Sequence, residues 1–262
     1  MREKESHWWT GQAGPGPVIA TAIHDGHALR PEVARAMILP EPDRLREEDP
    51  FTGQSVAGVA NHVIVNRSRF EIDLNRARDQ AVYETPDMAW GLDVWGQRPP
   101  ADLVARSLEM HDAYYRMIGA RIEDMLTRHD KVLMLDVHSY NHRRDGPDGD
   151  PTPQEKAPDV NIGTSSMPRE KWAWLVDPLI EEMAAFDFAG RKLDVRENVA
   201  FQGKGEQTRF VHERFPGSAC AIAFEYKKIY MDEWTGEPDL DALNAMRGLI
   251  DRLDAKAREL MA

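Results

Sequence analysis

Short apolar runs alternate along the chain with longer amphipathic stretches. Residues 18–23 (VIATAI) and 131–140 (KVLMLDVHSY) are compact apolar runs, the pattern of strands that are covered on both faces of a sheet. Over residues 102–129 the apolar positions recur at spacings of three, four and seven, which predicts a long amphipathic helix. A second such helix is predicted over residues 240–261. Strands that alternate with helices in this way favour a layered α/β domain.

Weaker patterns complete the predicted order of elements. Further strands are predicted at 62–66 (HVIVN), at 70–74, where apolar and charged residues alternate, and at 220–228 (CAIAFEYKK); shorter helices are predicted at 31–39 and 168–186. We predict no helix or strand in the segments rich in Pro, Gly or charged residues, which are 40–60, 84–100, 141–169 and 191–215.

The chain of 262 residues is long enough to bury a sizeable core, and no internal repeat or low-complexity tract divides it. Residues 1–17 end in GQAGPGP and are predicted to form an irregular N-terminal arm. Residues 18–262 are predicted to form a single catalytic domain with three-layer αβα architecture.

Charge and cysteine content narrow the class of protein. The net charge of −12 argues against a nucleic-acid or anionic-membrane partner, because phosphates would be repelled. The single cysteine, Cys220, excludes a disulfide framework and fits a reducing compartment. The N-terminal residues lack the apolar core of a signal peptide, and no window approaches a membrane span. We therefore expect a cytoplasmic protein; the sequence does not decide its oligomeric state.

Three predicted strands each end in an ionisable residue: His24, His138 and Glu225. In an open α/β sheet the carboxyl ends of the strands border the ligand crevice. Two imidazoles and one carboxylate can bind zinc and leave a position for water, and a further carboxylate beside that water would act as general base. Gly26 would let the turn after the first strand approach its neighbours closely. The alternative is that each ionisable residue caps its strand in solvent.

Asp136 lies two residues before His138, on the same face of the predicted strand. Its carboxylate would either orient the imidazole or bond to a backbone amide, and the sequence leaves both open.

A second group of polar residues lies in the stretch NRSRFEIDLNR. It places Arg67, Arg69 and Arg76 within ten residues, with Asn75 beside the last of them. Guanidinium groups bind carboxylates in bidentate fashion, and one near a metal can polarise a carbonyl. The alternative is a solvated basic edge of a strand.

The order of HDGH, IDLNR, DVHS and FEYKKIYMDE resembles that of the N-formylglutamate amidohydrolase family, which is related to zinc carboxypeptidases and to the aspartoacylase and succinylglutamate desuccinylase group. NIGT at 161–164 and the F-x-G-x₅-R run at 201–209 extend the resemblance, which covers residues 18–233. It implies a mixed central sheet of the zinc-exopeptidase type. The family's usual Pro-His-Gly or Pro-His-Ser turn is replaced here by Ile-His-Asp-Gly-His, which leaves the substrate open.

The resemblance also implies roles for individual residues. It makes His24 and His138 zinc ligands and Glu225 the base that activates water. We favour Asp49 as the third ligand, with Glu48 and His27 as alternatives. It also implies that Asn75 and Arg76 hold the substrate carboxylate. Arg67, placed with the catalytic residues, and Arg209 are further candidates for carbonyl or carboxylate contacts, and which arginine polarises the carbonyl stays open.

The activity implied is Zn²⁺-dependent hydrolysis of a small, acidic N-acyl amino acid such as N-formyl-L-glutamate. One alternative is a metallo-carboxypeptidase or another N-acyl amino acid deacylase on the same scaffold. Another is a non-catalytic ligand-binding protein that has lost the metal. The zinc content of the purified protein would separate the last of these from the enzymes.

Overall fold

A computed structural model describes residues 8–262, and a seven-stranded sheet runs through it in the order β1-β3-β2-β4-β7-β5-β6. The strands are β1 (Trp9–Gln12), β2 (Val18–Ala22), β3 (Asn61–Val65), β4 (Val132–Tyr140), β5 (Val160–Gly163), β6 (Val195–Glu197) and β7 (Ala219–Lys227). The central strands β3, β2, β4 and β7 are parallel. β1 is antiparallel to β3, and β5 is antiparallel to β7 but parallel to β6. The mixed α/β sheet is therefore as predicted.

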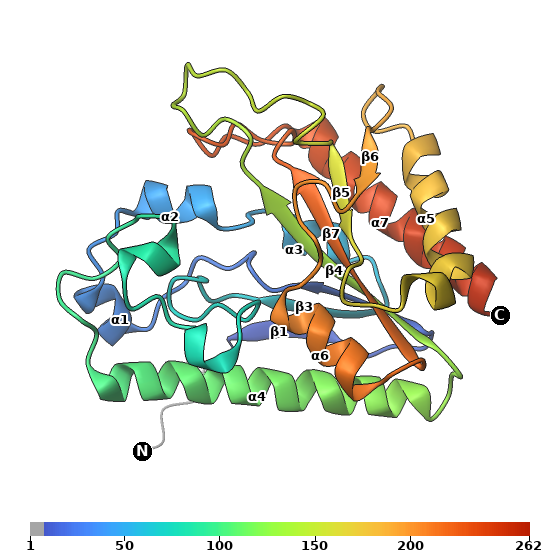
Figure 1. Cartoon of the computed structure of the whole chain (residues 1–262), viewed down its shortest axis with the longest axis horizontal. Helices are drawn as coiled ribbons and strands as arrows, with labels where there is room; N and C mark the ends of the chain where they lie inside the picture. The colour runs from blue at the N-terminus through green and yellow to red at the C-terminus, as the bar shows by residue number, and fades with distance from the viewer. Residues whose placement is uncertain (1–7) are drawn as a thin grey trace.

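Helices cover both faces of this sheet (Figure 1). They are α1 (Pro31–Ala36), α2 (Glu41–Glu47), α3 (Thr52–Val56), α4 (Ala101–Leu126), α5 (Ala173–Ala185), α6 (Glu206–Arg214) and α7 (Leu240–Met261), with 3₁₀ turns at Arg78–Gln80, Pro86–Ala89 and Arg169–Trp172. Apolar residues of α3, α5 and α7 share one hydrophobic cluster, and those of α1, α4 and α6 share another. Among the described residues, no helix has the length and apolar character of a membrane span.

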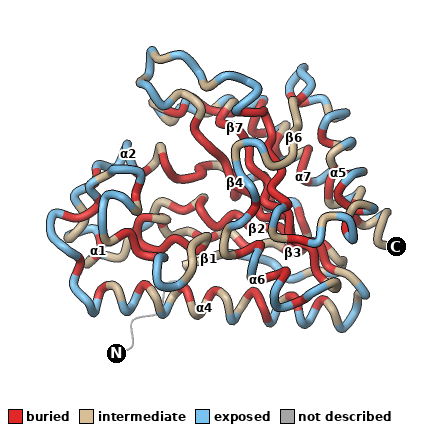
Figure 2. Tube along the Cα trace, in the orientation of Figure 1, coloured by how far each residue is buried: buried red, intermediate tan, exposed pale blue. Residues whose placement is uncertain are grey.

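Strand β4 shows why its sequence is a continuous apolar run. All nine of its residues are buried, and they alternate between the two hydrophobic clusters. Leu133, Leu135 and Val137 pack on the side of α5 and α7, while Val132 and Met134 pack on the side of α4. Figure 2 shows this burial along β4 and β7 against the exposed outer surface of α4. A strand covered on both faces needs no polar alternation.

The prediction of a strand at residues 70–74 is wrong. The segment is a series of turns, although Phe70, Ile72 and Leu74 are all buried as their alternation suggested. Asp73 between them is also fully buried, because it accepts hydrogen bonds from several donors. The alternation therefore reflects turns that bury charged and apolar side chains together, and not the two faces of a strand.

Several short elements lie where none was predicted. They are β1 in the N-terminal arm, α2 and α3 within 40–60, β5 within 141–169, and β6 and α6 within 191–215. The first seven residues of the arm lie outside the described part of the chain. These strands are only three or four residues long and pair at or next to a sheet edge, so long-range pairing decides them and local periodicity does not.

The NIGT motif fixes the loop between β6 and α6. The buried side-chain oxygen of Asn161 accepts hydrogen bonds from the backbone N–H groups of Val199 and Ala200, each at 2.9 Å. The side-chain amide of Asn161 donates to the carbonyl of Phe201 at 2.9 Å. As a result Phe201 is held with its ring 40% exposed near the carboxyl end of β7, where it lines a pocket.

The turn after β2 approaches the end of β3 as closely as expected. A Cβ added to Gly26 would lie 2.1 Å from the carbonyl carbon of Asn66. Replacement of Gly26 by alanine must therefore push two backbone segments apart. We expect Gly26→Ala to lower the free energy of unfolding by about 1–3 kcal/mol, measured by urea denaturation.

The control is Gly248→Ala in helix α7, where the added Cβ would meet only the end of the Phe186 side chain at 3.3 Å. Alanine is favoured over glycine in a helix interior, so this variant should be neutral or stabilised. Equal stability of Gly26→Ala and the wild-type protein would contradict the close approach.

Candidate metal centre

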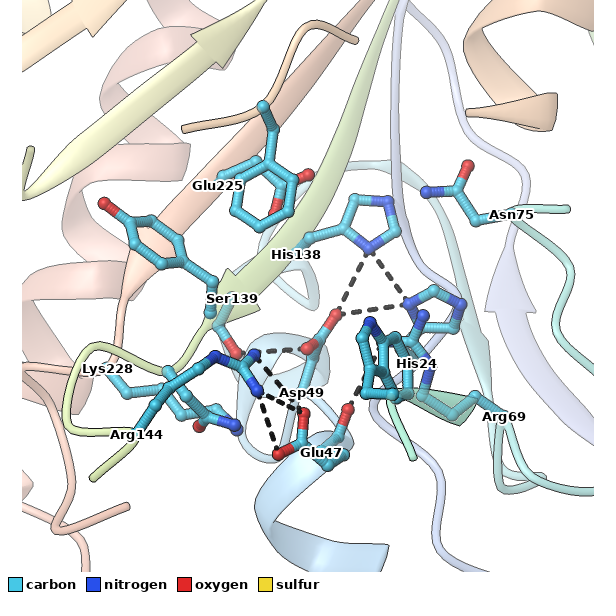
Figure 3. Close-up of a pocket in the computed structure, with 14 residues that line it drawn as sticks. His24, Glu47, Asp49, Arg69, Asn75, His138, Ser139, Arg144, Glu225 and Lys228 are labelled. Atoms are coloured by element: carbon cyan, nitrogen blue, oxygen red, sulfur yellow. Dashed lines mark hydrogen bonds and ion pairs between the residues drawn. The ribbon is translucent and has the colours of Figure 1, made fainter. Parts of the chain in front are cut away.

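Three side-chain atoms from distant parts of the chain meet at the carboxyl edge of the sheet (Figure 3). Nδ1 of His24 and Nδ1 of His138 are 3.2 Å apart, and Oδ2 of Asp49 lies 3.3 Å from the first and 3.2 Å from the second. His24 follows β2, Asp49 follows α2, and His138 lies near the end of β4. All three residues are buried.

This spacing fits a bound divalent cation. Ligands placed tetrahedrally at the zinc–nitrogen and zinc–oxygen distances found in proteins lie about 3.3 Å from one another. Two imidazole nitrogens and one carboxylate oxygen are ligands that zinc takes, and three protein ligands leave a coordination position for water.

The opposite nitrogen of each imidazole faces a buried carboxylate. His24 Nε2 lies 2.8 Å from Asp73 Oδ1, and His138 Nε2 lies 3.0 Å from Asp136 Oδ1. A proton on Nε2 is favoured by such a carboxylate, which leaves the Nδ1 lone pair of each ring directed at the common point. Two lone pairs and an anionic oxygen repel one another there unless a cation lies between them.

The electrostatics of the centre favour positive charge. Burial alone would raise the pKa of Asp49, but the hydrogen bonds and charges of His138 and His24 hold it well below its usual value. Burial alone would lower the pKa of His138, but the carboxylates of Asp136, Glu225 and Asp49 raise it well above the usual value. The same field that favours a proton on His138 would favour a metal ion.

Hydrogen bonds from neighbouring elements position the ligands and the carboxylates behind them. The backbone N–H of Asp49 donates to the carbonyl of His24 at 2.9 Å, which joins two ligand-bearing segments directly. The side-chain amide of Gln207, from α6, donates to Asp136 Oδ1 at 2.5 Å and to Thr21 Oγ1 at 2.7 Å. The orientation of His138 therefore depends on a helix that sequence periodicity did not predict.

Asp73 is a functional residue that the sequence did not single out. Besides His24, its carboxylate accepts hydrogen bonds from Arg69 Nη2 at 2.9 Å, from the Asn75 backbone at 2.8 Å and from the hydroxyl of Tyr83. In the sequence, Asp73 lies between the apolar residues Ile72 and Leu74. This alternation predicts that Asp73 lies on the solvent face of a strand, and so it gives no indication of a buried carboxylate.

Glu225 lies on β7 directly opposite His138 of β4, and its side chain lines the same pocket as the three ligands. Burial raises the pKa of Glu225 to about 7, and the charge of His138 partly offsets the rise. A carboxyl group with a pKa near neutrality can both accept and donate a proton.

Residues 16–231 match the family model described as FGase, N-formylglutamate amidohydrolase. The chain belongs to this family. The order of motifs in the sequence had predicted that membership, and the match confirms it.

Two solved structures have the same fold as this chain. The N-formylglutamate amidohydrolase from Ralstonia eutropha JMP134 superposes with a TM-score of 0.71 at 16% identity, covering 97% of this chain and 97% of that one. A gene product from Agrobacterium tumefaciens gives a TM-score of 0.66 at 16% identity, covering 95% and 92%. A putative carboxypeptidase from Burkholderia mallei ATCC 23344 gives only 0.38 at 13% identity, covering 96% and 59%, which supports no argument. No curated protein matches the chain.

The alternatives for the third ligand of this amidohydrolase-family site lie elsewhere. His27 and Glu48 bond to each other, and Ser68 and Arg44 surround them. Asp49 is the carboxylate that joins the two histidines.

The arginine positions differ from those expected. Arg67, a candidate for carbonyl or carboxylate contacts, does not line the pocket, and its nearest carboxylate is Glu71 at 4.0 Å. Arg69, two residues later, does line it. In a strand, Arg67 and Arg69 would point to the same face. The segment is a series of turns instead, so these two side chains have different surroundings.

The remaining residues implied to bind substrate are divided. Asn75 lines the pocket. Arg76 packs over the ring of Tyr83 at 4.6 Å and is not among the pocket-lining residues. Arg209, on α6, pairs with Glu206, is 44% exposed at its side chain and does not line the pocket either. The roles assigned to Arg67, Arg76 and Arg209 stay predictions. Nε of Arg76 lies 3.6 Å from the Asp73 carboxylate behind His24, whereas Arg67 lies near Glu71 and Arg209 pairs with Glu206.

We expect the isosteric change Asp136→Asn to weaken zinc binding by about tenfold or more, because it removes the charge that orients His138 while keeping an acceptor oxygen. Competition against a chromophoric chelator measures this affinity. The control is Asp112→Asn, a surface carboxylate that pairs with Arg78. Equal zinc affinity of Asp136→Asn and this control would show that the carboxylate behind His138 does not tune the site.

Proposed function

We propose that the protein is a zinc-dependent amidohydrolase that cleaves an N-acyl amino acid, with N-formyl-L-glutamate as the representative substrate. The observation that supports this most is the position of Glu225. Its buried carboxyl group, whose pKa is raised by burial, lies on β7 directly opposite the candidate metal ligand His138 on β4. Family membership supports the class of reaction.

His24, Asp49 and His138 would hold the ion. When bound, zinc supplies Lewis acidity, which lowers the pKa of water and polarises an amide carbonyl. Glu225 accepts a proton as water attacks the carbonyl carbon, and it delivers that proton to the amine nitrogen as the C–N bond breaks. The products are a carboxylate, formate in the case of a formyl group, and a free amino acid.

The walls of the pocket suit a small anion with an apolar part. The cations of Arg69, Arg144 and Lys228 line it, within a chain of net charge −12. The rings of Trp90 and Phe201 line it as well, and both are partly exposed. The carboxylates of Glu47, Asp49 and Glu225 line the same pocket. With a metal ion offsetting part of their charge, the three cations would favour a negatively charged substrate over a neutral one.

We expect Glu225→Gln to retain zinc at about one ion per chain but to lower kcat by about 100-fold or more, because the amide cannot accept a proton. Elemental analysis and turnover of N-formyl-L-glutamate measure the two effects. Glu213→Gln, an exposed site on α6, is the matched control. Undiminished turnover by Glu225→Gln would remove this residue from the mechanism.

The substrate itself is tested by comparing formyl, acetyl and succinyl amino acids with short peptides on the zinc-loaded protein. Cleavage of peptides alone would favour a carboxypeptidase. Protein that takes up no zinc would favour a ligand-binding role without catalysis.

A further inference from the structure

Three cations line the pocket, and two of them have their donors engaged. Arg69 donates to Asp73 at 2.9 Å, to the Tyr83 hydroxyl at 3.2 Å and to the carbonyl of Glu47 at 3.2 Å. Lys228 is buried, and its Nζ donates to the carbonyls of Arg46 at 2.5 Å and Glu48 at 2.7 Å. Both cations keep some N–H groups beyond those used in these bonds. Neither side chain can turn toward a new anion, however, without giving up buried hydrogen bonds, which is costly.

Arg144 is different. Its side chain is 48% exposed, and in the described part of the chain its guanidinium bonds only to the carboxylate of Glu47, at 3.4 Å. Figure 3 shows the two side chains facing each other beside Asp49, within the same pocket as the metal ligands. Contacts of this length are at the weak end for charge-assisted hydrogen bonds, so spare donor capacity remains.

Glu47 does not depend on this partner. Arg46 Nη1 donates to its carboxylate at 3.0 Å, a shorter contact than any from Arg144. If Arg144 turned to another anion, the carboxylate of Glu47 would keep a positive neighbour. The cost of exchanging partners is therefore small.

The backbone that leads into Arg144 is anchored. The N–H groups of His142 and Arg143 donate to the buried carboxylate of Glu233 at 2.8 and 2.7 Å. The indole N–H of Trp234 donates to the carbonyl of Arg143 at 2.9 Å. The root of the side chain is fixed at the pocket while its guanidinium stays adjustable, which suits selective binding of a ligand.

We propose that Arg144 determines specificity for acidic substrates by exchanging Glu47 for a substrate carboxylate. This inference rests on the proposed amidohydrolase function. A guanidinium binds a carboxylate with two parallel hydrogen bonds, and a neutral analogue forfeits the charge-assisted pair. The carboxylate belongs either to the amino-acid side chain or to the acyl group, and two substrate pairs distinguish these sources.

The test compares kcat and KM of the zinc-loaded wild-type protein and Arg144→Gln on two pairs of substrates. The first pair is N-formyl-L-glutamate and N-formyl-L-glutamine, and the second is N-succinyl-L-alanine and N-butanoyl-L-alanine. We expect kcat/KM to fall at least tenfold, mainly through KM, for the acidic member of one pair. It should change less than twofold for the other member, called neutral here because it lacks that second carboxylate and keeps only the α-carboxylate. The pair that responds identifies the source of the carboxylate.

Further variants separate binding from folding. Arg144→Lys keeps the charge without the planar fork and should recover part of the loss. Glu47→Gln removes the competing carboxylate and should lower KM for the acidic substrate several-fold. Arg143→Gln is the matched control, because its side chain contacts Pro147 and lies outside the pocket, and it should behave as the wild-type protein does.

Equal losses by Arg144→Gln on acidic and neutral substrates, or no loss, would overturn the inference while leaving the amidohydrolase function intact. Hydrolysis of none of the four substrates by the wild-type protein would instead count against the proposed function. In that case, calorimetric titration of glutarate into the wild-type protein and into Arg144→Gln tests whether Arg144 binds a carboxylate. At least tenfold weaker binding to Arg144→Gln would support the carboxylate site, and no difference between the two proteins would overturn it.

Discussion

The candidate site depends on one electrostatic constraint, which is that electron-pair donors converge on a single buried point. His24, His138 and Asp49 aim there, and Asp73 and Asp136 hold the two imidazoles from behind. Away from water, such a concentration of negative potential is stable only with positive charge at its centre. The turn after β2, the segment after α2 and the end of β4 each contribute to meeting this requirement.

Strand register adds the reactive group to this centre. β4 and β7 pair so that His138 lies opposite Glu225, and both side chains continue the rows that face α4 and α6. A slip of one residue would turn Glu225 toward α5 and α7, because side chains alternate along a strand. The pairing that separates the two hydrophobic clusters therefore also places the proposed base, Glu225, opposite the candidate metal ligand His138.

The sequence predicted the site residues that lie at the ends of recognisable apolar strands. The strands that present His24, His138 and Glu225 are long or strongly apolar, so their ends could be located. Asp49 was reached only through the family resemblance, since nothing nearby in the chain links it to the histidines. The positions of Arg69, Asp73 and Arg144 could not be predicted, because they lie in turns and loops whose side-chain directions are fixed by distant contacts such as those of Tyr83, Glu47 and Glu233.

Both hydrophobic clusters are complete without any contribution from the metal ligands. In a zinc finger the ion builds the fold, and chelation unfolds it. Here we expect the reverse order, in which the apoprotein folds first and a metal ion binds afterwards at a site that is already formed. Scarcity of metal would then set the fraction of molecules that is active, while the fraction that is folded stays the same.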